Sequence, residues 1–336
     1  MKQTMKQWLE DLRTAAVKKP FPILSFPTVQ LMGCSVEELV SSSDRQGDGI
    51  AKVAARVDSA AAIGFMDLSV EAECFGAQLV LMEGEVPSVT GSIITEMEEA
   101  EALQIPEVGA GRTGIYVDGI KKAVEQITDR PVFAGMIGPY SLAGRLFGVT
   151  ESMYMCYDEP ETVELVLEKV TEFLIAYGKA YKAVGAGGIM IAEPLAGTLS
   201  PAMEAQFSAP YVKKIVEALQ DEDFLIVYHN CGNSVPFMLD SILSNGAAAY
   251  HFGNSVSMKE ILEKANPGTV IMGNVDPSSQ FRNGTPESVA AETKRIMGEC
   301  CSHPNFVISS GCDIPPLSPW ENIDAFFGAA AEFYGA

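Results

Sequence analysis

The sequence predicts a parallel α/β barrel built from eight strand and helix units, the (β/α)8 fold. Eight short apolar runs recur along the 336 residues, and helical patterns fill most of the later intervals between them. Polar and metal-ligating side chains collect where these runs stop. In a (β/α)8 barrel the carboxyl ends of the strands form the rim that carries the active site. We therefore expect a single domain over residues 1–336, with its site at that rim.

The elements follow from the apolar periodicity and from local start and stop signals. An amphipathic helix is expected within residues 1–19, as a plug or cover of the barrel, and residues 76–92, centred on Glu83-Gly84, predict an inserted β-hairpin near the barrel mouth. Ser35-Val-Glu-Glu is a capping box that begins a short helix. Further helices are expected at 48–64, 96–103, 112–129 and 158–184, and strands at 20–29, 65–71, 131–139, 188–194, 224–231, 247–253, 270–276 and 306–312.

Composition restricts the classes of partner and compartment. The formal net charge of −21 disfavours nucleic acid and anionic membranes, because binding to either requires clustered Lys and Arg. Seven cysteines without a framework spacing indicate reduced thiols. The first ten residues lack the apolar core of a signal peptide, and no apolar stretch approaches membrane-spanning length. We expect a soluble, cytoplasmic protein. A doubly wound fold is disfavoured because no glycine-rich phosphate loop follows the first run.

The most informative stretch is Val227-Tyr-His-Asn-Cys-Gly232, where an apolar run ends in an imidazole and a thiol. His229 and Cys231 point the same way from an extended backbone, so both can reach one ion. Cys312 follows another apolar run in the same manner and supplies a third ligand. Two thiolates and one imidazole make a zinc site with an open fourth position. The plainer alternatives are buried apolar cysteines, a histidine bonded to a backbone carbonyl, or a Cys231–Cys312 disulfide.

Other polar residues lie at the ends of expected strands and are candidates for the chemistry. A carboxylate such as Glu193, at the end of an apolar strand, must be paired, protonated or functional, and we assign it a catalytic role. His251 and Asn274 are further catalytic candidates, and Asp276 is a candidate for substrate binding. Arg145, in a glycine-containing segment after the third strand, is a candidate anion contact. For the last four residues, a structural role is an equal alternative.

Several segments together resemble one family. His229-Asn-Cys-Gly, Gly273-Asn-Val-Asp-Pro and Gly311-Cys-Asp-Ile-Pro-Pro-Leu-Ser-Pro-Trp-Glu-Asn are similar to the zinc-dependent methylcobamide:coenzyme M methyltransferases of the uroporphyrinogen decarboxylase superfamily. The resemblance implies zinc at His229, Cys231 and Cys312, and methyl transfer from a methylated corrinoid to a thiol. Glu193 stands where that family often has Asp. The arginine-rich segment with which the superfamily's decarboxylases hold porphyrinogen carboxylates is absent, since no basic residue follows Phe26 until Arg45.

Three functions remain open at this point: a corrinoid-dependent methyltransferase acting on a thiol such as coenzyme M, a porphyrinogen-type decarboxylase, and a non-catalytic zinc or corrinoid-binding module. Zinc content separates the first two, and turnover with methylcobalamin and a small thiol separates the first from the third. A corrinoid ring is too wide for a barrel filled by side chains. We therefore expect methylcobalamin, or a separate corrinoid protein, to bind over the barrel mouth, with the hairpin near Gly84 and the amino-terminal helix as docking surfaces.

Overall fold

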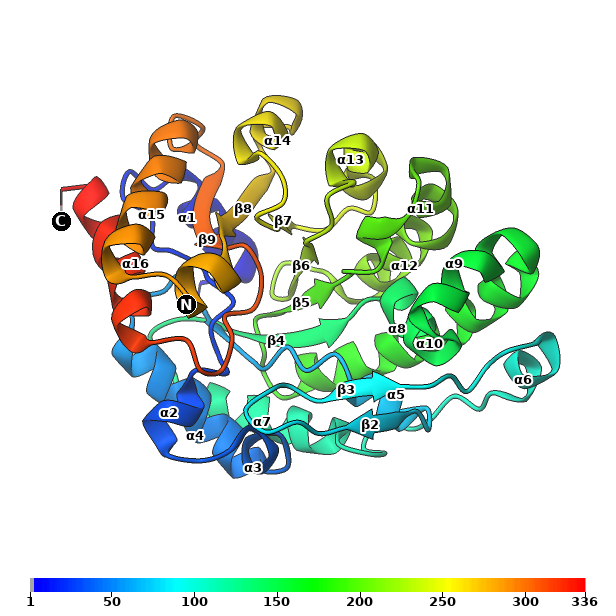
Figure 1. Cartoon of the computed structure of the whole chain (residues 1–336). Coiled ribbons are helices and arrows are strands. Elements are labelled where there is room, and N and C mark those ends of the chain that lie inside the picture. Colours follow the sequence, from blue (N-terminus) through cyan, green and yellow to red (C-terminus); the bar gives the residue numbers. More distant parts are fainter. Residues whose placement is uncertain (1–2, 336) are drawn as a thin grey trace.

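The computed structural model describes residues 3–335, so residues 1, 2 and 336 of the expected domain lie outside it. Its main feature is a curled, parallel sheet of seven strands with helices around its outer side (Figure 1). The strands, in their spatial order, are β1 (Ala62–Ile63), β4 (Val132–Ile137), β5 (Gly188–Ala192), β6 (Leu225–Asn230), β7 (Ala249–Phe252), β8 (Val270–Val275) and β9 (Phe306–Ser310). The expected eight-stranded barrel is therefore confirmed only in part, whereas its last six strands are confirmed.

The expected first strand, residues 20–29, does not form a strand. Pro20 and Pro22 have no N–H to donate to a ladder, and the segment is extended but irregular until helix α2 begins at Thr28. It still bridges the two edges of the sheet. The Phe21 N–H donates to the Ile308 carbonyl of β9 over 3.0 Å, and the Ala60 N–H, just before β1, donates to the Pro20 carbonyl over 2.8 Å.

The expected second strand, residues 65–71, is also displaced. The strand at this place is β1, which precedes it, and Val70–Cys74 forms helix α5. The Asp67 side chain accepts a hydrogen bond from the Ser69 N–H, which turns the chain before the predicted strand can continue. The expected helix at 48–64 is α4, which ends at Arg56. The prediction therefore placed both this helix and the second strand too far along the chain.

The remaining helices and the hairpin agree well with the sequence pattern. Ser35 and Glu38 form the predicted capping box of α3, and β2 (Gln78–Val80) pairs antiparallel with β3 (Ser88–Thr90) in the predicted hairpin. The helices are α1 (Met5–Thr14), α2 (Thr28–Met32), α3 (Val36–Val40), α4 (Ser43–Arg56), α5 (Val70–Cys74), α6 (Met97–Ala102), α7 (Thr113–Gln126), α8 (Pro139–Phe147), α9 (Val149–Asp158), α10 (Pro160–Ala183), α11 (Pro201–Phe207), α12 (Ala209–Leu219), α13 (Val235–Leu243), α14 (Met258–Lys264), α15 (Pro286–Cys300) and α16 (Trp320–Phe333). In the described part of the chain, no helix combines the length and apolar character needed to cross a membrane.

Alternation along the strands divides the core into two parts. In β5, Ile189 and Ile191 face the outer helices, whereas Met190 and Ala192 join the cluster enclosed by the sheet. Val227 of β6 belongs to the same inner cluster. Because side chains alternate with a period of two, the next inward positions of β6 are residues 229 and 231, at the carboxyl end of the strand.

Helix α1 closes the opposite end of the sheet. Trp8 packs against Phe21 and against Phe133 near the start of β4, with ring centroids 6.2 and 5.5 Å apart. The Lys6 N–H donates to the carbonyl of Glu222, which precedes β6. The helix is thus the expected plug, but the expectation that it flanks the mouth is wrong. Its apolar face is buried against the amino ends of the strands.

Candidate metal site and its surroundings

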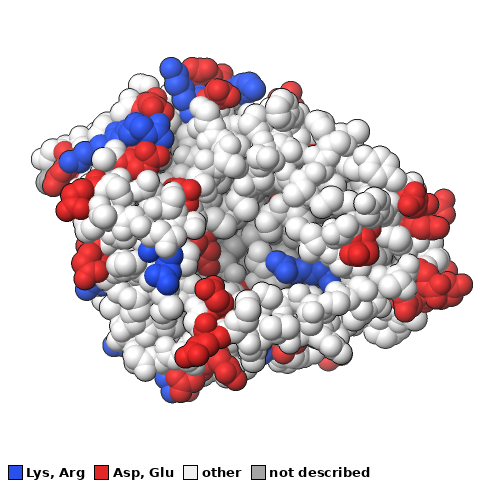
Figure 2. All heavy atoms as spheres, in the orientation of Figure 1, with Lys and Arg blue, Asp and Glu red and all other residues white. Residues whose placement is uncertain are grey.

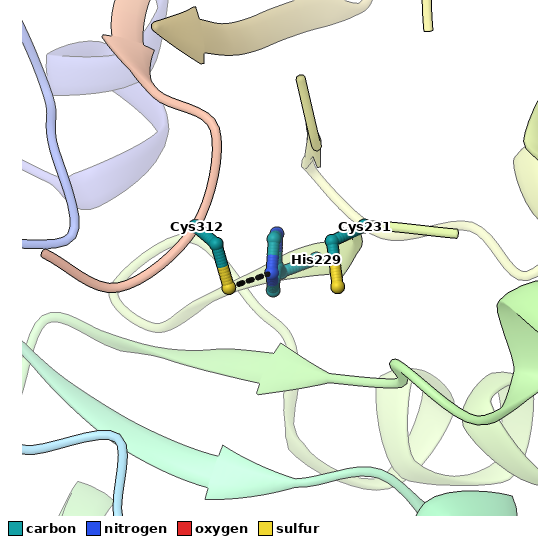
Figure 3. A group of neighbouring side chains, drawn as sticks. All are labelled: His229, Cys231 and Cys312. Carbon is teal, nitrogen blue, oxygen red and sulfur yellow. Dashed lines mark hydrogen bonds between the residues drawn. The ribbon is translucent and has the colours of Figure 1, made fainter. Parts of the chain in front are cut away.

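The structure brings His229, Cys231 and Cys312 together at the carboxyl end of the sheet (Figure 3). His229 is near the end of β6, Cys231 follows that strand directly, and Cys312 lies two residues beyond β9. Two glycines permit this approach. A Cβ on Gly253 would lie 2.6 Å from Cys231 Cα, and one on Gly311 would lie 2.7 Å from the Asn254 nitrogen.

The ligand atoms of these three side chains all lie within 4.8 Å of one another. His229 lies between the two thiols in Figure 3, and its Nε2 is 3.4 Å from the Cys312 Sγ. A hydrogen bond from the Cys312 thiol lowers the pKa of Cys231 to about 4, against the opposing effect of burial. The same hydrogen bond, together with burial and the charge on Cys231, raises the pKa of Cys312. One of the two thiols is therefore poised to ionise readily.

This donor set fits zinc. Thiolate sulfur and imidazole nitrogen are the ligands of zinc sites, and three protein ligands leave a fourth position for a substrate. The two thiols are half-buried rather than sealed in the core, so the site is accessible from the mouth. Figure 2 shows one face of the molecule hollowed near its centre, with basic and acidic side chains at the edge of the hollow.

His251 lies directly behind His229 and does not belong to the three-residue cluster. It is fully buried, and its Nδ1 is 2.8 Å from the Nδ1 of His229. Its Nε2 is 2.7 Å from the Ser309 hydroxyl. Burial, followed by the charge of His229, lowers the pKa of His251 well below its ordinary value. The predicted catalytic residue therefore contacts a candidate ligand rather than the open side of the site.

Glu193 is placed at the end of β5, as predicted, but both of its oxygens are engaged by α8. Oε1 accepts from the Tyr140 N–H at 2.8 Å, and Oε2 accepts from the Ser141 N–H at 2.9 Å and the Ser141 hydroxyl at 2.7 Å. Gly138 provides the space for the Glu193 side chain, since a Cβ at residue 138 would lie 2.2 Å from Glu193 Cγ. Burial raises the pKa of Glu193 to about 7. Its catalytic role stays a prediction, and these contacts give it the role of a helix cap.

Asn274 and Asp276 organise loops at the same rim. The Asn274 amide donates to the carbonyls of Gly253 and Val256, both at 2.8 Å, and so fixes the loop after β7. The Asp276 carboxylate accepts from the Ser278 and Ser279 N–H groups at the start of a π-helical turn, Pro277–Arg282. Both residues line a cavity of about 290 Å³. Their predicted roles in catalysis and substrate binding remain untested.

Arg145 lines a second cavity, of about 390 Å³, between the exit of the hairpin and the junction of α8 and α9. Its Nε is buried without a hydrogen-bond partner. Burial lowers the pKa of Arg145, whereas the nearby carboxylates of Glu71 and Asp67 oppose that shift. A guanidinium whose Nε is buried without a hydrogen-bond partner suits an anionic ligand. The role of Arg145 as an anion contact stays a prediction.

The sequence analysis missed a polar cluster beside this cavity and the partner of His251. Asp67 accepts from the Arg112 guanidinium and, at 2.7 Å, from the Tyr116 hydroxyl, and Glu71 accepts from the Ile137 N–H at the end of β4. Asp67 follows an apolar run, which is the signal that singled out Glu193. Ser309 carried no comparable signal, because its role depends on how β7, β8 and β9 lie side by side.

The fold and the site together define a parallel α/β protein with a thiol and imidazole cluster at the carboxyl end of its sheet. Residues 30–333 match the uroporphyrinogen decarboxylase (URO-D) family, and the chain belongs to that family. It is 30% identical to the methylcobamide:CoM methyltransferase MtbA of Methanosarcina acetivorans, over 80% of this chain and 78% of that protein. A uroporphyrinogen decarboxylase of Pseudomonas syringae pv. syringae is 27% identical over 81% of this chain and 78% of its own length.

A solved structure of a methyltransferase resembles this chain in its three-dimensional arrangement. A methyltransferase from Methanosarcina mazei superimposes with a TM-score of 0.87 and 25% identity, over 99% of this chain and all of the other. A methyltransferase therefore shares the architecture of this chain. The methyltransferase relatives support an enzyme of the methyltransferase kind, as the sequence analysis expected.

Proposed function

We propose that the protein is a zinc-dependent methyltransferase that moves a methyl group from a methylated corrinoid to a thiol such as coenzyme M. The observation that carries this proposal is the convergence of His229, Cys231 and Cys312 at the carboxyl end of the sheet. A zinc ion held there would lower the pKa of a thiol substrate and keep its sulfur nucleophilic. The thiolate sulfur then forms a bond to the methyl carbon, while the cobalt–carbon bond breaks and leaves its electron pair on cobalt.

The surrounding residues act by binding and positioning. We propose that Arg145 binds an anionic part of the thiol or of the methyl donor, and that Asp276 contributes to substrate binding at the neighbouring rim. Glu193, His251 and Asn274 serve the chemistry by holding α8, His229 and the loop after β7 in place. The buried hydrogen bonds of all three residues support this division of roles.

A decarboxylase of porphyrinogen type is the second candidate, and the decarboxylase relatives support it. The segment that would grip several carboxylates carries no basic residue here. Phe26 leads into α2, and the next basic side chain along the chain is Arg45 of α4, which lies beside Glu38 at 3.5 Å. The described structure thus offers little there to hold a polyanion, and the methyltransferase is the better-supported function. A non-catalytic zinc or corrinoid-binding module is the third candidate.

We further propose that the methyl donor is a separate corrinoid protein that docks over the mouth. The turn of the β2–β3 hairpin lies against the loop that follows Cys312, since a Cβ on Gly84 would be 3.2 Å from Leu317 Cδ1. Leu81, Met82 and Leu317 are each about half exposed there. Exposed apolar side chains on the hairpin turn and on the loop that follows Cys312 are suited to burial by a partner.

Metal analysis and turnover test the proposal together. The wild-type protein should hold one zinc, and Cys312→Ala should lose it, whereas Cys34→Ala, at a free and half-buried thiol, should retain it. With methylcobalamin and coenzyme M, only the zinc-loaded proteins should form the thioether. Full zinc occupancy in Cys312→Ala would show that the three-residue site is wrong. Release of carbon dioxide from uroporphyrinogen without any methyl transfer would favour the decarboxylase, and zinc binding without turnover would favour the module.

A further inference from the structure

We propose that His251 and Ser309 are positioning residues that fix His229 in the tautomer whose Nε2 is free to bind the metal. This inference rests on the zinc site proposed above, but it does not depend on which reaction the site performs. The proposed function assigns to His251 only the support of His229, and it gives Ser309 no role.

The three side chains occupy one layer inside the sheet. Val227, Ala249 and Val307 belong to the enclosed cluster, and His229, His251 and Ser309 each follow two residues later on the same strand, facing the same way. His229 and His251 are direct partners in the register of β6 and β7. The hydrogen-bonded line therefore runs from β6 to β7 and then, past β8, to β9.

The line ends at a group that can only accept a hydrogen bond. The Ser309 hydroxyl donates to the carbonyl of Phe21 over 2.7 Å, which uses its single proton. Ser309 Oγ must then accept from His251 Nε2, which lies 2.7 Å away. This places a proton on Nε2 of His251. The carbonyl of the irregular amino-terminal segment thus sets the tautomer of a histidine on β7.

The same reasoning determines the proton on His229. His251 is fully buried and has no carboxylate among its hydrogen-bond partners, so it is neutral. With Nε2 protonated, its Nδ1 is an acceptor. The 2.8 Å contact between the two Nδ1 atoms then requires the proton to belong to His229. His229 Nε2 consequently presents its lone pair towards Cys312 and the metal position, 3.4 Å from that thiol.

Ligands held in this way usually lose about 10- to 100-fold in metal affinity when the supporting hydrogen bond is removed. His251→Leu removes the acceptor and should weaken zinc binding by about that factor, as measured by competition with a chelator. His251→Asn is the matched variant, because its Oδ1 stands where Nδ1 stood. It should restore affinity to within a few-fold of wild type. If His251 only filled space in the core, the Asn variant would not bind zinc more tightly than the Leu variant.

The proton positions can be observed directly by nitrogen NMR of the zinc-free protein, since the chain has only three histidines. We expect His229 to carry a proton on Nδ1 and His251 to carry its proton on Nε2, and His303→Gln identifies the third set of signals. A proton on Nδ1 of His251 would overturn the proposal, as would wild-type zinc affinity in a folded His251→Leu variant.

Ser309 provides a second route if His251→Leu does not fold. Ser309→Ala removes the hydroxyl and should release the His251 proton from Nε2 and weaken zinc binding, whereas Ser309→Thr retains the hydroxyl and should preserve both. Unchanged proton positions and an unchanged zinc affinity in Ser309→Ala would refute the proposed effect of Ser309 on the two histidines. If the wild-type protein binds no zinc, the proposed function fails. The proton positions still decide whether Ser309 and His251 fix the tautomer of His229.

Discussion

Glu193→Gln separates a catalytic carboxylate from one that caps a helix. The side chain satisfies the first free N–H groups of α8, those of Tyr140 and Ser141, because Pro139 has none to offer. A glutamine keeps the shape but has only one carbonyl oxygen. Whichever way its amide is turned, one of these two buried N–H groups faces an NH2 group instead of an acceptor. Burial raises the pKa of Glu193 and of Glu204 alike to about 7, so Gln relieves the same buried charge at either position. Relative to Glu204→Gln, the expected loss in the free energy of unfolding is about 1–3 kcal/mol, for the hydrogen bond that only Glu193 gives up.

The assay has two parts, a urea unfolding curve and the rate of methyl transfer per folded molecule. We expect a lower urea midpoint for Glu193→Gln than for Glu204→Gln, with an unchanged slope, and a rate of methyl transfer within about threefold of wild type. Glu204→Gln is the matched control, because Glu204 is also fully buried and neither of its oxygens has a hydrogen-bond partner. A folded Glu193→Gln variant that is about 10²–10⁴-fold slower would instead restore the proton-handling role that the sequence predicted.

Three further predictions concern pH, anion binding and docking. Burial raises the pKa of Glu204 from 4.5 to about 7, so the contribution of Glu204 to stability is present below pH 4.5 and is lost as the pH rises through 7. The free energy of unfolding of Glu204→Gln should therefore exceed that of wild type by up to about 3 kcal/mol at pH 8. Unfolding free energies of the two proteins that run parallel from pH 4.5 to 8 would contradict this. Arg145→Gln should raise KM for an anionic thiol or for the methyl donor about tenfold, with kcat little changed. An identical KM would show that Arg145 does not bind the substrate. Deletion of residues 79–88, which contain most of the hairpin, should lower kcat/KM with a methylated corrinoid protein but not with free methylcobalamin; an equal loss with both donors, or no advantage of the protein donor in wild type, would exclude docking there.

The sequence predicted best those elements whose signal is local. β4 to β9 are continuous apolar runs, and the three candidate metal ligands were visible because each follows such a run. The segment at 20–29 has the same apolar character, but Pro20 and Pro22 prevent the ladder that would make it a strand. The turn made by Asp67 and Ser69 similarly displaced the second strand.

The contacts of the site residues required the three-dimensional structure. Glu193 and Ser141 are 52 residues apart, so the capping of α8 leaves no pattern in the sequence. The line from His229 to Ser309 depends on the register of neighbouring strands, which their apolar runs do not specify by themselves. Strand ends therefore identified which residues gather at the rim, but not which of them support others.

The irregular segment around Phe21 has a consequence for the order of assembly during synthesis. The candidate zinc site draws on residue 21 for the carbonyl that ends the hydrogen-bonded line, on β6 and β7 for the two histidines, and on residue 312 for a thiol. A nascent chain that has emerged only as far as β8 lacks both Ser309 and Cys312. It could form much of the curled sheet, but it could not present the complete site to a metal. Zinc capture would thus report that β9 has joined the sheet. A ribosome-bound chain stalled before residue 306 should therefore compete poorly for the ion with the released protein.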